Sequence, residues 1–246
     1  MRTVKIFFMT VFSVTLIFSS ADAAKKKSAG YTPEAGSAEN AAKKNPAIPY
    51  DESLPDVLII GDSISIGYTP NVKMNLRGAA NVFHSQGNSQ GTQWGVENVD
   101  KWLEHKKPWA VIHFNWGLHD LKRWENGKNS DNPKAPRQSE IDVYAKNMEL
   151  LVSKLVATKA KLIFATTTPY PSGVSPWRDP EDATRYNQVA LAIMQKNSIP
   201  VDDLYTAIQP KLAELQQPEN VHFAPEGYAF LGNAVAKSIK AALEGK

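Results

Sequence analysis

The stretch Val57-Leu58-Ile59-Ile60-Gly61-Asp62-Ser63 decides the fold class of this chain. Four consecutive apolar residues predict a short strand buried on both faces, because a strand with one solvated face would alternate apolar and polar residues. The polar turn that follows leads into a helix, which makes a strand–helix unit. Comparable apolar runs recur further along the chain, at residues 81–84, 110–114, 162–165 and, more weakly, 199–201.

Helical patterns separate these runs. The clearest follows Ser139, a candidate N-cap, where apolar residues recur at spacings of three and four: Ile141, Tyr144, Met148, Leu151 and Leu155. Other helices are predicted at about 181–196 and from Pro225 onwards. Strands that alternate with helices predict an α/β domain of three layers, α/β/α, around a five-stranded parallel sheet. Ligands bind such sheets beyond the carboxyl ends of the strands, so the residues after each strand are the candidate site.

Composition excludes several classes of protein. The 246 residues include no cysteine, which rules out disulfide frameworks, zinc–cysteine sites and cysteine nucleophiles. Residues 1–50 carry seven Lys/Arg against three Asp/Glu, whereas residues 51–246 carry 21 against 22. The basic excess therefore belongs to the N-terminal segment. The near-neutral remainder gives no indication of the basic patch that nucleic-acid binding requires.

The N-terminus has the pattern of a targeting segment. Arg2 and Lys5 precede 13 residues of apolar character at 6–18, and Ala21-Asp22-Ala23 offers a cleavage site. We predict a signal peptide at 1–23 and export to the periplasm or the bacterial exterior, with no stable membrane insertion after its removal. The alternative is an uncleaved anchor, for which the apolar run is short. Residues 24–50, rich in Lys, Ala, Gly and Pro, are predicted to be a flexible linker, and 51–246 the folded domain.

Residues with chemical potential follow the predicted strands in order. The blocks are Gly61-Asp62-Ser63, Ser85-Gln86-Gly87-Asn88, Asn115-Trp116-Gly117-Leu118-His119-Asp120 and Thr166-Thr167-Thr168-Pro169, with Glu219-Asn220-Val221-His222 near the C-terminus. This arrangement resembles the SGNH subgroup of the GDSL hydrolases, which are esterases with a flavodoxin-like sheet. The resemblance covers about residues 56–243.

The resemblance implies a role for each block. Ser63 takes the place of the family's nucleophile, and His222 that of its base, with Glu219 where the family has the Asp that orients the base. Gly87 corresponds to the glycine whose backbone N–H donates to the oxyanion. His119 stands where the family has an Asn, the second oxyanion donor. The chain therefore departs from the family pattern at His119 and Glu219.

Elementary chemistry supports these roles. A serine hydroxyl needs a neighbouring base, and the ordinary pKa of histidine suits that task. The amides of Ser63 and Gly87 and an imidazole N–H of His119 could stabilise an oxyanion. Glu219 has an alternative interpretation as a solvated loop acid, which leaves His222 to be oriented by Asn220 or a backbone carbonyl.

The remaining titratable residues are interpreted as structural. Asp120 is expected to brace its block. His84, His105 and His113 lack the spacing of metal ligands. No metal site and no cofactor are predicted.

Two long segments, 121–138 and 169–180, follow the third and fourth strands and resemble binding loops. The substrate-binding candidates are Trp116, Trp124, Tyr170, Trp177 and Arg178, although Trp124 and Trp177 could instead anchor their loops. The expected substrate is a small acyl ester or an acylated carbohydrate. The runs from Phe114 to Asp120 and from Thr166 to Pro169 also resemble those of bacterial SGNH proteins linked to carbohydrate deacetylation, which implies a carbohydrate ester. Two alternatives remain: a lysophospholipase or thioesterase, and a catalytically impaired carbohydrate-binding homologue.

Overall fold

The computed structural model describes residues 48–106 and 108–245, which belong to one compact unit. The predicted signal peptide, 1–23, and residues 24–47 of the predicted linker lie outside the described residues. Tyr50, the last residue of that linker, contacts the domain: its ring centroid lies 3.5 Å from Lys106 Nζ and 6.2 Å from the ring of Phe83. Among the described residues, Tyr50 thus contacts the domain although it precedes the predicted domain boundary at residue 51.

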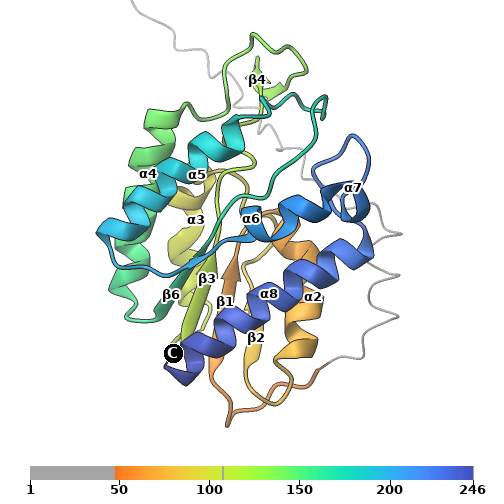
Figure 1. The fold of residues 1–246 in the computed structure, drawn as a ribbon. Coiled ribbons are helices and arrows are strands. Elements are labelled where there is room, and N and C mark those ends of the chain that lie inside the picture. The colour runs from red at the N-terminus through yellow and green to blue at the C-terminus, as the bar shows by residue number, and fades with distance from the viewer. Residues whose placement is uncertain (1–47, 107, 246) are drawn as a thin grey trace, which may run out of the picture. The chain divides into compact units, whose positions relative to one another are not determined.

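The sheet is five-stranded and parallel, as predicted. Its strands are β1 (Asp56–Ile60), β2 (Asn81–His84), β3 (Val111–Phe114), β6 (Lys161–Ala165) and β7 (Val201–Asp202), in the order β2-β1-β3-β6-β7. The carboxyl ends of these strands lie at one edge (Figure 1). Strand order reverses between β1 and β3, so a ligand crevice is expected beyond the ends of these two strands.

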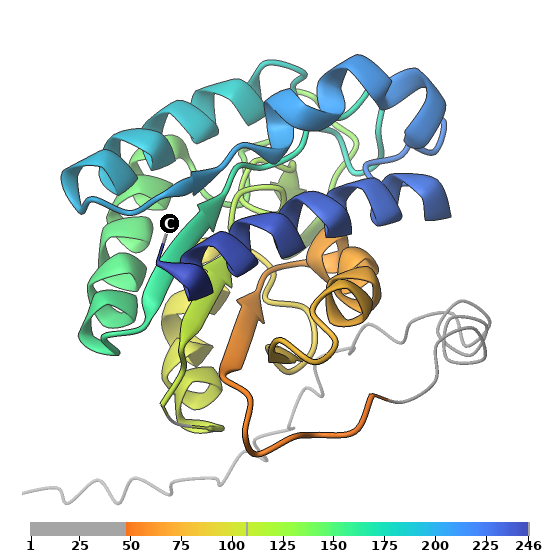
Figure 2. The ribbon, with the colours of Figure 1, turned by 60° about the horizontal axis from the view of Figure 1, so that its bottom comes forward.

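Helices cover both faces of the sheet. On one face α2 (Ser63–Asn75) packs against α8 (Pro225–Glu244), which also contacts α6 (Leu204–Ile208). On the other face α3 (Thr92–Glu104), α4 (Ile141–Ala157) and α5 (Asp182–Lys196) pack side by side. Figure 2 shows α8, in dark blue, crossing in front of the strands, with α2, in orange, beside it. The predicted three-layer architecture is confirmed.

The rest of the described chain is short elements and loops. A hairpin of β4 (Trp124–Glu125) and β5 (Lys128–Asn129) interrupts the first long segment, and η1 (Gln209–Lys211) and α7 (Leu212–Leu215) follow α6. Within the described residues no helix is long and apolar enough to cross a membrane.

One predicted helix boundary is wrong. Helix α4 begins at Ile141, and Ser139 does not cap it. The backbone of Ser139 is instead held by tertiary hydrogen bonds: its N–H donates to Asp120 O (2.9 Å), and its carbonyl accepts from the Tyr186 hydroxyl (2.6 Å). These bonds tie the start of α4 to the block that contains His119 and Asp120.

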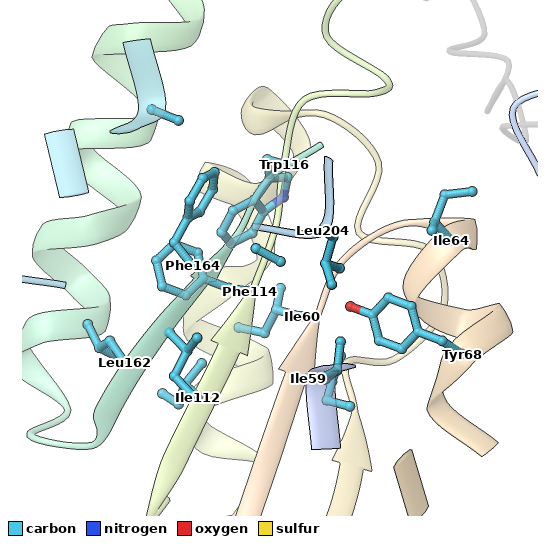
Figure 3. Close-up of a cluster of buried hydrophobic side chains, with 14 of the residues drawn as sticks. Ile59, Ile60, Ile64, Tyr68, Ile112, Phe114, Trp116, Leu162, Phe164 and Leu204 are labelled. Carbon is cyan, nitrogen blue, oxygen red and sulfur yellow. The ribbon is translucent and has the colours of Figure 1, made fainter. Parts of the chain in front are cut away.

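The apolar runs form the core between the layers. In Figure 3 the side chains of Ile59 and Ile60 lie near those of Ile112 and Phe114 from the neighbouring strand. Val57 to Ile60 are at most 2% exposed, as continuous apolar strands require. This rigid sheet fixes the strand ends on which the candidate site is built.

Candidate active site

Ser63 is the first residue of α2, at the tight turn after β1. The buried side chain of Asp62 caps the helix, because its Oδ1 accepts from the Ile64 N–H at 2.9 Å. Burial raises the pKa of Asp62, although this hydrogen bond and the positive charge of Arg178 oppose that effect. No described residue accepts the Ser63 N–H, which is therefore available at a helix N-terminus, where negative charge is favoured.

His222 faces this serine from the loop before α8. Its Nε2 lies 2.8 Å from Ser63 Oγ, and its Nδ1 lies 2.7 Å from Asn220 Oδ1. The same Asn220 oxygen accepts the backbone N–H of His222 at 3.1 Å, which identifies that atom as the amide oxygen. Nδ1 must then carry the proton and donate it to Asn220. Nε2 is left with a lone pair directed at the serine hydroxyl.

The surroundings keep His222 neutral. Burial lowers its pKa, and the cationic Arg178 lowers it further, because both disfavour the imidazolium. A neutral imidazole with a free Nε2 is the form that can accept a proton from Ser63.

The structure does not bring Glu219 to His222. Glu219 is exposed, has φ of 51°, and its side chain makes no hydrogen bond or ion pair with any described residue. A turn causes this: Gln217 N donates to His222 O at 3.0 Å, and Asn220 N donates to Gln217 O at 3.3 Å. Within this turn Asn220, not Glu219, reaches the imidazole. The sequence-based hypothesis that Glu219 orients His222 is thus replaced by its alternative, Asn220.

Gly87 lies in the loop after β2, with φ of 72°. That left-handed conformation favours glycine, although a Cβ here would have nothing within 4 Å. The loop is fastened to the site, since Ser89 N donates to Gly61 O (3.0 Å) and Ser89 Oγ bonds Ser85 Oγ (2.7 Å). The Gly87 N–H donates to no acceptor in the described part of the chain and so is free to bind a ligand.

His119 is fixed by Lys122, three residues further on. Lys122 Nζ lies 3.4 Å from His119 Nδ1. An ammonium can donate but cannot accept, so Nδ1 is the acceptor and the single proton of the neutral ring sits on Nε2. Burial lowers the pKa of His119 well below its ordinary value, and the charges of Lys122 and Arg178, together with His222, lower it further. His119 is therefore a neutral donor within the electrostatic reach of His222.

Asp120 braces this block against α3, as expected. Its carboxylate accepts from the Thr92 N–H (2.9 Å) and the Thr92 hydroxyl (2.5 Å) at the start of α3. The side chain is fully buried, and burial raises its pKa to about 6. These hydrogen bonds connect the segment after β3 to the first residue of α3.

Two substrate-binding candidates belong to the core instead, which corrects the prediction. Trp116 is fully buried beside Phe114 (ring centroids 6.0 Å apart), and Figure 3 places it there. Tyr170 is buried, and its hydroxyl donates to Asp179 O at 2.8 Å, which anchors its own loop. An aromatic residue after a strand has the same sequence pattern whether it faces the core or the solvent, so sequence alone did not separate these cases.

The other three candidates occupy the two long segments. Trp124 and Trp177 are half-buried. The ring centroid of Trp124 lies 5.0 Å from Lys122 Nζ. The backbone of Trp177 is bonded to the first long segment: its carbonyl accepts from Arg123 N (2.8 Å), and its N–H donates to Ser130 O (3.1 Å). Arg178 is buried, and its Nε donates to Leu118 O at 3.0 Å. Arg178 thus lies against the residue that precedes His119.

Two of the remaining histidines, His84 and His113, make hydrogen bonds within the domain, and His105 is exposed. His113 pairs with Asp202 in the core (3.1 Å). His84 Nε2 bonds Ser65 Oγ at 2.7 Å, and burial lowers the pKa of His84 to about 4. Sequence reasoning did not anticipate this second serine–histidine contact, two residues from Ser63, or the role of Lys122. Among the described residues no group of three or more His, Asp or Glu could hold a metal ion.

Comparisons with known proteins agree with the fold and the order of the blocks. A family model described as the GDSL-like lipase/acylhydrolase family matches residues 59–230. No curated protein sequence matches the chain. Among solved structures, a lipase/acylhydrolase from Enterococcus faecalis is similar with 23% identity and a TM-score of 0.63, over 76% of this chain and 96% of that one.

Two further solved structures are similar to this chain. Axe2, an acetylxylan esterase from Geobacillus stearothermophilus, has 19% identity and a TM-score of 0.61 over 75% of this chain and 94% of its own. The acetyl xylan esterase AlAXEase has 14% identity and a TM-score of 0.60 over 75% and 99%. At these identities the likeness shows the fold alone.

Proposed function

Because the chain belongs to the GDSL-like lipase/acylhydrolase family and is a hydrolase of ester bonds, we propose that it is a serine esterase that removes small O-acyl groups, acetyl in particular, from carbohydrate. One observation carries the mechanism: Ser63 Oγ, His222 and Asn220 form a continuous hydrogen-bonded chain, with links of 2.8 and 2.7 Å. It is the arrangement that a nucleophile, its base and an orienting group require.

In the first half of the reaction Ser63 Oγ attacks the ester carbonyl carbon while His222 Nε2 accepts the hydroxyl proton. The Nδ1–H of the resulting His222 imidazolium donates to Asn220 Oδ1, which holds the ring in place. The tetrahedral intermediate then collapses: the bond to the alcohol oxygen breaks, and His222 returns the proton to the leaving alcohol. Ser63 is left acylated.

The negative oxygen of this intermediate is stabilised by three donors: the N–H groups of Ser63 and Gly87, and Nε2–H of His119. Both amides lack an acceptor among the described residues. Lys122 places the His119 proton on Nε2. Donors that are already oriented stabilise developing charge without reorganising.

In the second half a water molecule attacks the acyl-serine carbonyl while His222 accepts its proton. The same donors hold the oxyanion, and collapse releases the carboxylic acid with return of the proton to Ser63. Both halves use His222 as base and then as acid, so no cofactor is required.

Two observations support a small acyl group on a carbohydrate. Two solved structures with this fold are named acetylxylan esterases. Half-buried Trp124 and Trp177 can offer ring faces to a sugar.

The first test is Ser63→Ala, which should abolish turnover of an aryl acetate. Ser65→Ala is the matched control, because Ser65 Oγ also contacts a histidine (2.7 Å to His84) but has no role in the mechanism. An organophosphonate should label Ser63 alone, as peptide mass spectrometry can determine. Near wild-type activity in Ser63→Ala, or labelling of Ser65, would overturn the proposal.

The acyl group is tested with a series of aryl esters of increasing chain length. We expect the highest kcat/KM for acetate and a steep fall beyond it. A maximum at long chains would favour a lipid or thioester hydrolase, and absence of turnover with retained glycan binding would favour an impaired carbohydrate-binding protein.

We also propose that the enzyme acts outside the cytoplasm, on the pattern of residues 1–23. N-terminal sequencing of protein recovered from cell fractions tests this. The expected mature chain begins at Ala24 in the exported fraction; an intact Met1 there would contradict cleavage.

A further inference from the structure

Two cations are buried close to the Ser63–His222 pair. Arg178 is 4% exposed and Lys122 is 6% exposed. Neither forms an ion pair within the described part of the chain. Lys122 Nζ contacts His119, and the charge of Arg178 acts on both His119 and His222. Buried charges are ordinarily paired, because loss of hydration is costly. Two cations without a partner ion at one site therefore need an explanation.

Arg178 has unused hydrogen-bonding capacity. A guanidinium has five N–H donors. Two of them are used in the described structure: Nε donates to Leu118 O (3.0 Å) and Nη1 to Pro176 O (3.0 Å). Three are left, including both on Nη2. That nitrogen is not among the fully enclosed atoms without a partner, so it keeps some contact with solvent.

The nearest acids do not neutralise these cations by contact. Asp62 acts electrostatically on Arg178 and Lys122, and Asp120 acts on Lys122. However, Asp62 is engaged with the Ile64 N–H, and both oxygens of Asp120 are engaged with Thr92.

We propose that the substrate carries a carboxylate close to the scissile ester, and that Arg178 binds it. This inference rests on the proposed esterase function and names its substrate class. A planar carboxylate matches the free fork of a guanidinium, and charge-assisted bonds of this kind are strong. Lys122 adds positive potential at the same place. On a carbohydrate such a group is the carboxylate of a uronic acid.

The experiment compares matched substrates. One is an O-acetylated uronic acid oligosaccharide, and its partner is the same molecule with every carboxylate converted to a neutral carboxamide. A second pair, an aryl hemisuccinate and an aryl ester with an uncharged acyl chain of equal length, places the carboxylate on the acyl side. We expect wild-type kcat/KM to favour the anionic member of at least one pair by about tenfold or more. In Arg178→Met that ratio should fall close to one.

The ratio between paired substrates is the readout, because a general loss of activity leaves it unchanged. Arg77→Met is the matched control: Arg77 is exposed beyond the far end of α2, about 20 Å from Ser63 at 1.5 Å per helical residue. If Arg178→Met does not fold, Arg178→Gln, which keeps N–H donors but removes the charge, should give the same fall.

Two results would overturn the inference. The first is that the wild type has equal kcat/KM for the two members of each substrate pair. The second is that the preference for the anionic substrate survives in the folded Arg178 variant. Hydrolysis of a neutral aryl acetate tests the esterase function independently, so failure of this inference leaves that function intact. An inactive wild type on every ester would instead overturn the proposed function.

Discussion

Lys122 Nζ lies 3.4 Å from Nδ1 of His119 and thereby decides which nitrogen of that ring carries the proton. An asparagine amide has N–H donors of its own and needs no such neighbour. A neutral histidine has one donor, which can sit on either nitrogen. Replacing the amide with an imidazole therefore requires a second residue to fix the tautomer, and a lysine three residues later supplies it.

The first prediction concerns His119 itself. His119→Ala should lower kcat by about 10²-fold, because one oxyanion donor is lost. His119→Asn should retain most activity, since the amide donates in its place. Steady-state kinetics on an aryl acetate measures both. Wild-type turnover in His119→Ala would mean that backbone amides are the donors.

The second prediction is that Lys122 acts through His119. Lys122→Met should lower kcat about tenfold with little change in KM, because the ring can then place its proton on Nδ1, away from the oxyanion. In a His119→Asn background the same substitution should have no further effect on kcat. Lys128→Met, an exposed lysine in the same segment, is the control. Equal losses in the two backgrounds would show that Lys122 acts independently of the imidazole.

The third prediction separates Asn220 from Glu219. Asn220→Ala should lower kcat about tenfold or more, because His222 loses the acceptor that sets its tautomer. Glu219→Gln should remain close to wild type, because the exposed side chain contacts no described residue. The reverse ranking in kcat would restore Glu219 as the orienting acid.

The pH dependence of kcat/KM tests the same contact between Asn220 and His222. Burial and Arg178 lower the pKa of His222, so the acid limb of kcat/KM in the wild type should lie below pH 6.5. Asn220→Asp places an anion beside Nδ1, which stabilises the imidazolium and raises that pKa. The acid limb of the active Asn220→Asp enzyme should therefore move to higher pH; a shift to lower pH would show that Asn220 is not the partner of His222.

The sequence predicted the sheet well because β1, β3 and β6 consist mostly of apolar residues, and the polar turns that follow them mark the strand ends. The sequence also identified Ser63 and His222 as candidates, because each belongs to a short block of residues and these blocks follow one another along the chain in the order that the family resemblance implies. The sequence predicted less well which individual side chains contact each other. Glu219 and Asn220 are adjacent in sequence, and only the turn from Gln217 to His222 decides which one reaches the imidazole.

Burial was the other property that the sequence did not reveal. Trp116 and Tyr170 lie in the segments after β3 and β6, where binding residues are expected, yet both are buried. Ser139 precedes a helix like a cap, but its backbone is held by Asp120 and Tyr186. In each case a tertiary contact overrides a local pattern, and such contacts depend on loops whose course the sequence does not specify.

The last prediction concerns Asp120 and stability. Burial raises the pKa of this acid in the folded protein to about 6, against about 3.9 in an unfolded chain, so the folded state binds its proton more tightly. Its contribution to the free energy of unfolding is therefore greatest below pH 4 and is lost as the pH rises through 6. Asp120→Asn tests this pH dependence, because the amide keeps an acceptor for Thr92 but cannot ionise.

Relative to wild type, the Asp120→Asn variant should gain up to about 3 kcal/mol in the free energy of unfolding between pH 4 and pH 7. Urea titrations at several pH values measure this difference, with Asp131→Asn, an exposed carboxyl in the following segment, as control. A difference that is constant with pH, or that moves in the opposite direction, would mean that hydrogen bonds from Thr92 outweigh burial and that Asp120 is ionised in the folded protein throughout this range.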